Sequence, residues 1–263
     1  MDVNALLQCF ASTLHQDASI RSHAENQLKE ASKTPGFLGA CLDIISSNEV
    51  PENIKLSTSL YFKNKIIYGW AVSVYSTSKN ELLNHGVDND EKPVVQDMII
   101  KTMLNCSSNS PHCLKILRPA LKTIISEEYP KGKWADLLPK SLELLSNSDV
   151  DVAYVGLICL TEIFRTYRFK ENDDRQDLEK LILEYFPALL TYATDTLFQD
   201  GKNMDNNKVG DLLVLILKIY KFVTYHDLPF ILQRAEFFVP WANLFVQIIQ
   251  APLPQSIMNV QDT

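Results

Sequence analysis

Apolar residues recur at helical spacing along almost the whole chain, beginning at its N-terminus. The apolar positions of the first two segments are Leu6, Phe10, Leu14, Ile20, Ala24, Leu28 and Ala31. Intervals of three and four residues place such side chains on one face of a helix. Asp17 lies in the polar break between the two segments, where its carboxylate can accept hydrogen bonds from the free N–H groups of the second helix. The pattern predicts a helical hairpin.

The same pattern repeats to the end of the chain. Further helices are predicted at 36–46, 51–70, 93–104, 110–126, 134–145, 152–167, 174–198, 206–225 and 230–249. Pro51 is expected at the first position of its helix because it has no N–H to leave unpaired. Pro119 is expected to kink or interrupt its helix because it removes a backbone donor.

Period-two alternation, the mark of strands, is not sustained anywhere in the sequence. Helical hairpins that repeat at roughly 35–55 residues are typical of an α-solenoid, in which each hairpin buries its apolar face against its neighbours. We therefore expect an all-α, right-handed α-solenoid of HEAT repeats, with about five helical hairpins and a terminal helix. Residues 1–126 would hold repeats one to three, with an extended loop at 76–92. Residues 127–250 would hold further repeats, and 251–263 a polar tail.

The charge balance restricts the partners. The chain has 25 Lys and Arg against 32 Asp and Glu, a net charge of −7, and no run of basic residues. Direct binding to nucleic acid is disfavoured, because it depends on clustered cations. Five cysteines, an odd number, lie mostly among apolar neighbours and indicate buried thiols in a reducing compartment. With no signal-peptide pattern and no span of roughly 18 apolar residues, we expect a soluble intracellular protein.

Catalytic and metal-binding patterns are missing from the sequence. The histidines are scattered, and Cys106, His112 and Cys113 have no second Cys/His cluster to complete a zinc site. The acidic cluster at 88–91 lacks the Gly and the terminal Glu of an EF-hand and fits a solvated loop better. No nucleophile motif or phosphate-binding glycine loop occurs. We expect no enzyme activity, no catalytic residue, no metal and no cofactor.

The segment 57–70 does not fit a purely structural interpretation. Lys63 lies within roughly 40° of Leu56 and Ile67 on a helical wheel, so it would be costly to bury. In one interpretation, Lys63, Asn64 and Tyr68 face a partner on the inner layer of the solenoid. In the other, Lys63 extends past its neighbours to solvent and Asn64 holds an inter-repeat turn. The aromatic residues of this segment, Tyr61, Phe62 and Trp70, are expected in the core.

Several motifs together resemble the importin-beta family of nuclear transport receptors. They are Ala24-Glu25-x-x-Leu28, Leu60-Tyr61-Phe62-Lys63-Asn64-Lys65-Ile66 ending at Trp70, and Ile124-Ile125-x-x-x-Tyr129-Pro130-x-x-x-Trp134 followed by Leu137-Leu138-Pro139. Within the family, Pro35-Gly36-Phe37-Leu38 and Tyr220-Lys221-Phe222 resemble the fungal relatives of importins seven and eight. By this resemblance, residues 1–126 are the importin-beta N-terminal domain. Family members are several times longer, so the chain is expected to be an N-terminal fragment or a truncated gene product.

The resemblance implies a binding protein that uses its first repeats to hold the GTP-bound form of the small GTPase Ran. The implied contacts are Lys63, Asn64 and Tyr68, with Arg165 and Arg168 as weaker candidates. It also implies binding of phenylalanine-glycine nucleoporins in crevices between outer helices. The candidates for those crevices are Phe186, Tyr192, Phe237 and Trp241, for each of which core packing is the alternative.

Other implied partners are import cargo proteins of basic character and importin-beta itself, with shuttling between cytoplasm and nucleus and no membrane contact. A generic HEAT-repeat scaffold that binds a different protein partner is the alternative, because the same fold serves many functions.

Overall fold

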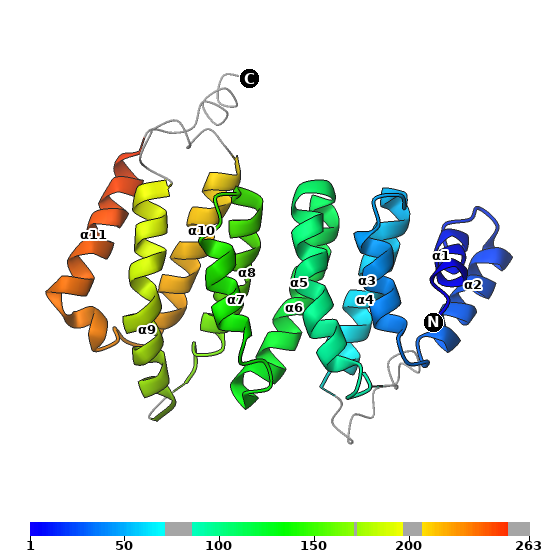
Figure 1. Cartoon of the computed structure of the whole chain (residues 1–263), viewed down its shortest axis with the longest axis horizontal. Coiled ribbons are helices and arrows are strands. Elements are labelled where there is room, and N and C mark those ends of the chain that lie inside the picture. The colour runs from blue at the N-terminus through cyan, green and yellow to red at the C-terminus, as the bar shows by residue number, and fades with distance from the viewer. Residues whose placement is uncertain (72–85, 171–172, 197–206, 252–263) are drawn as a thin grey trace. The chain divides into compact units, whose positions relative to one another are not determined.

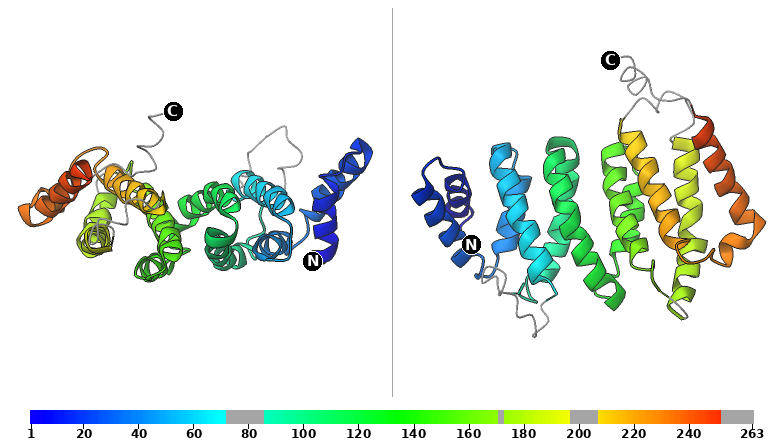
Figure 2. Two further views of the ribbon diagram at one scale, coloured as in Figure 1. Left: turned by 90° about the horizontal axis from the view of Figure 1, so that it is seen from above. Right: turned by 180° about the vertical axis from the view of Figure 1, so that it is seen from behind.

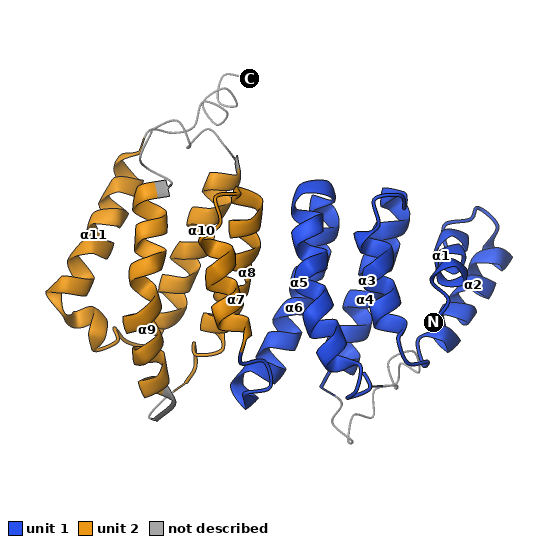
Figure 3. Cartoon of the chain, in the orientation of Figure 1, with its two compact units in different colours: residues 1–135 blue, residues 136–263 orange. Residues whose placement is uncertain are grey.

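The structure is a computed structural model, and it describes residues 1–71, 86–170, 173–196 and 207–251. Those residues form eleven α-helices and no strand, so the predicted all-α class is confirmed (Figure 1). The chain divides into two compact units, residues 1–135 and residues 136–263, called unit 1 and unit 2 below (Figure 3).

Unit 1 consists of three helical hairpins. Its helices are α1 (Val3–Ser12), α2 (Ala18–Ala31), α3 (Phe37–Ser46), α4 (Glu52–Gly69), α5 (Lys92–Asn109) and α6 (Pro111–Glu128), followed by the 3-10 turn Tyr129–Lys131. In the second and third hairpins the helices form two layers, with α3 beside α5 and α4 beside α6 (Figure 2). One side of α4 and one side of α6 therefore face away from α3 and α5.

The core of unit 1 lies between these layers. Tyr61 of α4 links three helices there, because its ring contacts Phe10 of α1 and Phe37 of α3, with ring centroids 5.9 and 5.6 Å apart. Phe62 and Trp70 are fully buried. The prediction that these three aromatic residues belong to the core is confirmed for Phe62 and Trp70, whereas Tyr61 is half-buried at the edge of the core.

Unit 2 continues the alternation of helices. Its elements are α7 (Leu137–Leu145), α8 (Val150–Arg165), α9 (Asp173–Thr191), a short π-helix (Tyr192–Thr196), α10 (Asn207–Val223), a 3-10 turn (Ile231–Gln233) and α11 (Ala235–Gln250). Helix α8 packs against both α7 and α10. Gly156 makes the close approach of α7 and α8 possible, since a Cβ atom there would lie 2.8 Å from the Ser141 carbonyl oxygen and 2.9 Å from the Leu145 nitrogen.

Side-chain caps fix several helix starts. The Asp17 carboxylate accepts a hydrogen bond from the Ser19 N–H at 2.7 Å, so the predicted cap of the second helix is confirmed. Helix α3 begins differently. Gly36 precedes it at φ +83°, where glycine avoids the steric cost of a Cβ atom. The Glu91 carboxylate, just before α5, accepts a hydrogen bond from the Leu38 N–H at 2.8 Å. The cap of α3 therefore comes from the next hairpin.

Several predictions about elements are wrong in detail. Pro51 precedes α4 instead of starting it, because its ψ of 143° is extended. Helix α6 continues through Pro119, so the predicted interruption is wrong, whereas a kink at Pro119 stays a prediction. Helix α7 begins at Leu137, so Trp134 lies in the preceding turn, although it is buried. Leu14 and Ile20 are exposed, because the apolar face of the first hairpin is narrower than predicted.

Parts of the predicted loop and tail fall outside the described residues. These are residues 76–85 of the loop at 76–92, Phe198 and Asn206 at predicted helix ends, and residues 252–263 of the tail. The described end of the loop, residues 86–91, turns into α5 with the Asp90 N–H donating to the Asp88 carboxylate.

Candidate functional site

Helix α4 has two sides with different surroundings. At 100° per residue, its buried positions fall on one arc of the helix and its exposed positions on the opposite arc. The exposed arc carries apolar side chains, with Leu60 at 47%, Ile67 at 37% and Tyr68 at 58% of full exposure. Lys63 and Asn64 lie on the same arc and are half-buried. We call Leu60, Lys63, Asn64, Ile67 and Tyr68 the α4 face.

The polar side chains of the α4 face have no partners within the described part of the chain. Neither Lys63 nor Asn64 nor Tyr68 makes a side-chain hydrogen bond or an ion pair there. Asn64 thus does not hold a turn between the described repeats. Three apolar or aromatic groups beside an unpaired ammonium and an amide can contact both apolar and acidic groups of a protein partner.

The buried lysines of α4 lie on the other arc. Lys55 and Lys65 are each 5% exposed, and Lys63, which the wheel singled out, is not among the buried residues. Burial lowers the pKa of Lys65, and the nearby Glu91 carboxylate partly opposes this shift. The burial of these two lysines was not predicted, because α4 has apolar residues on both sides and the sequence does not show which side faces the core.

Helix α6 adds basic groups beside the α4 face. It lies next to α4 in the same layer (Figure 2), and its exposed side carries Lys115, Pro119, Lys122 and Ser126. Lys115 and Lys122 make no ion pair with any described residue. In a chain with a net charge of −7, these unpaired lysines give this side of unit 1 a local positive character. Their spacing of seven residues, about two helical turns, could have predicted from the sequence that the two lysines share one face of the helix.

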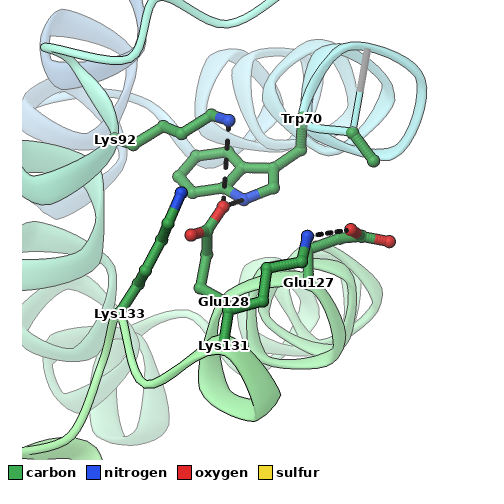
Figure 4. Close-up of a pocket in the computed structure, with 7 residues that line it drawn as sticks. Trp70, Lys92, Glu127, Glu128, Lys131 and Lys133 are labelled. Carbon is green, nitrogen blue, oxygen red and sulfur yellow. Dashed lines mark hydrogen bonds and ion pairs between the residues drawn. The ribbon is translucent and has the colours of Figure 1, made fainter. Parts of the chain in front are cut away.

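A polar pocket of about 300 Å³ lies at the C-terminal end of α4 (Figure 4). Its lining residues are Trp70, Ala71, Lys92, Glu127, Glu128, Lys131 and Lys133. The Trp70 indole N–H donates to Glu128 Oε1 at 2.9 Å, and Lys92 Nζ lies 3.8 Å from the same oxygen and 5.4 Å from the indole ring centre. Lys131 pairs with Glu127 at 3.0 Å.

These contacts connect the second and third hairpins. Glu128 is 4% exposed, so its carboxylate depends on Trp70 and Lys92 for the hydrogen bond and charge that water would otherwise supply. The hydrogen bond and ion pair of Glu128 hold the end of α4 against α5 and α6, and they thereby fix the position of the α4 face.

The predicted arginines lie in unit 2. Arg165 ends α8, where its Nε is 2.8 Å from Glu162 Oε2 and its guanidinium carbon lies 4.7 Å from the centre of the Phe222 ring. Arg168 lies in the following turn, 3.8 Å from the centre of the Tyr225 ring. Both arginines are half-buried and stacked on aromatic rings of or next to α10.

The predicted crevice residues separate into two kinds. Phe186 and Trp241 are buried, with ring centroids 5.0 Å apart, so the structure gives both the core role that was the alternative to a crevice. Sequence spacing could not show this, because both sides of α9 and α11 carry apolar residues. Tyr192 and Phe237 are half-buried and keep part of their rings at the surface.

The described residues contain no group of three or more His, Cys, Asp or Glu side chains that could hold a metal ion. None of the described helices combines the length and apolar character that a bilayer span requires.

Comparison with known proteins gives the family. The importin-beta N-terminal domain matches residues 24–105. Over 262 residues the chain is 64% identical to the Saccharomyces cerevisiae protein named Nonsense-mediated mRNA decay protein 5, covering 100% of this chain and 25% of that protein. It is 28% identical over 265 residues to the Probable importin-7 homolog of Dictyostelium discoideum, and the match covers 97% of this chain and 23% of that protein. The chain belongs to the importin-beta family.

The chain thus spans about a quarter of the length of these importin-beta family relatives. Among solved structures, the exportin Cse1 in its cargo-free, cytoplasmic state matches with a TM-score of 0.78 and 20% identity, over 97% of this chain and 26% of that one. Kap95p, in a structure whose subject is its binding to RanGDP, matches with a TM-score of 0.59 and 16% identity. The match covers 95% of this chain and 27% of the Kap95p chain. These neighbours are HEAT-repeat solenoids, so the predicted fold is confirmed.

The α4 face lies within the family domain. Lys63, Asn64 and Tyr68 fall between residues 24 and 105, whereas Arg165 and Arg168 fall beyond that range.

Proposed function

We propose that this importin-beta family chain binds the GTP-bound form of Ran through the α4 face and takes part in protein import through the nuclear pore. One observation carries the proposal: α4 exposes three apolar or aromatic side chains beside an unpaired lysine and asparagine, inside the family domain. Apolar and aromatic side chains beside polar ones are typical of surfaces that bind another protein. The family relationship makes Ran the first partner to test.

Selectivity for GTP would originate in Ran. The structure of Kap95p describes a receptor whose binding gives the switch loops of RanGDP their GTP-bound conformation. A receptor surface that fits only this conformation must reorganise the switch loops of RanGDP when it binds, and the reorganisation lowers the affinity. By analogy, the α4 face would contact the switch region.

The double variant Lys63→Ala, Asn64→Ala tests the site. Loss of a hydrogen bond to a charged group at a buried interface costs roughly 1.5–3 kcal/mol. We therefore expect the dissociation constant for Ran-GTP to rise about tenfold or more. The helical circular dichroism should stay unchanged, because neither side chain makes a hydrogen bond or ion pair within the described structure.

Lys101→Ala provides the matched control. Lys101 is an exposed lysine of α5 that pairs only with Asp97 of the same helix, so its removal should change the Ran-GTP affinity less than about twofold. Equal affinities of the double variant and the unchanged chain would remove Lys63 and Asn64 from the site.

We also propose that Tyr192 and Phe237, the two predicted crevice residues that stay partly exposed, each contribute to binding phenylalanine-glycine nucleoporins. Immobilised phenylalanine-glycine peptides should retain the chain, and Phe237→Ser should reduce the retention. Equal retention by serine-glycine peptides would count against this proposal. Passage through the pore would place the protein in both the cytoplasm and the nucleus.

A further inference from the structure

A cluster of aromatic and cationic side chains lies where α8 and α10 end, side by side in unit 2. Phe169, Tyr225 and His226 form it with Arg168, and we call these four residues the Arg168 patch. The Phe169 and Tyr225 rings meet edge to face, with centroids 5.5 Å apart and planes at 83°. Phe169 is 65% and Tyr225 45% exposed, so the cluster is open to solvent.

Aromatic rings hold the Arg168 guanidinium in place. Its central carbon lies 3.8 Å from the Tyr225 ring centre and 4.8 Å from the Phe169 ring centre. Stacking of this kind fixes the plane of the guanidinium and leaves its edge, which carries the N–H donors, free to bind a planar anion.

The Arg168 side chain has no hydrogen-bond partner among the residues that the structure describes. Its Nε is buried and makes no hydrogen bond, and no carboxylate of the described residues lies within ion-pair distance of its guanidinium. The nearest arginine along the chain, Arg165, also has an Nε without a well-oriented hydrogen bond, but its guanidinium lies 2.8 Å from Glu162 Oε2 and donates to Glu162 Oε1 at 3.2 Å. The two terminal nitrogens of Arg168 are not among the buried unpaired atoms, so they reach the surface, where a ligand can bind them.

We propose that the Arg168 patch binds a carboxylate side chain of a protein partner, in a segment where an Asp or Glu stands next to an apolar residue. The guanidinium edge would hold the carboxylate with two parallel hydrogen bonds. The apolar neighbour would pack against the exposed edges of Phe169 and Tyr225. The observations behind this proposal come from unit 2 and not from the α4 face. Arg168 is also a weaker candidate for contact with Ran, so the test below uses peptides and no Ran.

The geometry favours an acidic peptide over a nucleic acid. Single-stranded nucleic acids bind by stacking their bases on open aromatic faces, within a groove that is positively charged along its length. In the patch, Arg168 already covers the face of Tyr225 and lies over Phe169, and the two rings stand edge to face. The net charge of −7 also opposes a polyanion more strongly than a single carboxylate.

The test measures binding of a fluorescent peptide in which Glu-Leu pairs alternate with Gly-Ser spacers, beside the same peptide with Gln-Leu pairs. We expect the Glu peptide to bind at least about tenfold more tightly than the Gln peptide. Arg168→Gln should weaken the Glu peptide by a similar factor. Arg168→Lys should weaken it as well, because a lysine cannot offer two parallel donors.

Arg234→Gln is the control variant. Arg234 is an exposed arginine of the same unit that stacks on none of the described aromatic rings, so its loss should change the affinity less than about twofold. Equal binding of the Glu and Gln peptides, or unchanged binding to Arg168→Gln, would overturn the proposal. Tighter, Arg168-dependent binding of oligouridylate than of the Glu peptide would overturn it too, in favour of a nucleic-acid site. If a variant folds poorly, the affinities of the unchanged chain for the Glu and Gln peptides still test the proposal.

Discussion

At the scale of single residues, burial decides the chemistry of the cysteines. Cys41, Cys106, Cys113 and Cys159 are buried, and Cys9 is half-buried. Burial raises the pKa of the Cys106 and Cys159 thiols from 9.0 to about 12. It also raises the pKa of Cys41 and Cys113. A raised pKa keeps the thiol protonated, and the protonated form is a poor nucleophile.

These states predict how the native chain reacts with a thiol reagent. At pH 8, a thiol of pKa about 12 is ionised in roughly one molecule in ten thousand. Native protein should therefore label rapidly at Cys9 and slowly at the four buried cysteines, and all five should label in denaturant. Cys9→Ser should abolish the rapid phase. Rapid labelling of several cysteines in the native chain would contradict the described burial.

At the scale of elements, helix contacts depend on small residues at particular positions. Gly156 of α8 lies against α7, and backbone atoms of α7 occupy the space that a Cβ atom at this position would need. Gly210, in α10 of the same unit, has no heavy atom within 4 Å of an added Cβ atom. The two glycines are therefore a matched pair, one required by packing and one not.

Gly156→Ala should lower the free energy of unfolding by about 1–3 kcal/mol, because the added methyl group forces α7 and α8 apart. Gly210→Ala should raise it by about 0.5–1 kcal/mol, because alanine loses less backbone entropy in a helix. Urea unfolding followed by circular dichroism measures both. Equal stabilities of the two variants would show that α7 and α8 do not meet as closely as described.

The sequence predicted elements better than contacts. Apolar spacing gave the helices and their pairing, because an amphipathic face needs no knowledge of its partner. Contacts between distant residues were not predictable. Trp70 and Glu128 are 58 residues apart, and nothing local to either indicates their hydrogen bond.

The candidate site was predicted only in part, for the same reason. Lys63, Asn64 and Tyr68 lie on one face of α4, but the wheel could not distinguish half-buried Lys63 from buried Lys65. Only packing against α3 and α6 decides which side of α4 is inward. Lys115 and Lys122 belong to the candidate surface because α6 packs beside α4, which their local sequence does not indicate.

At the scale of the whole molecule, an acidic chain of the importin-beta family presents unpaired lysines beside exposed apolar groups on unit 1. Lys63, Lys115 and Lys122 contrast with the net charge of −7. Such a local contrast favours association with an acidic surface and disfavours indiscriminate binding. The chain spans about a quarter of its relatives, so Ran binding within this span is the central claim to test.

The most direct measurement is calorimetric titration of the chain with Ran loaded with a non-hydrolysable GTP analogue, beside Ran loaded with GDP. We predict that the GTP form binds at least about tenfold more tightly, because RanGDP must first reorganise its switch loops. Equal affinity for the two forms, or no binding of either, would contradict the proposal and favour a HEAT-repeat scaffold with a different partner.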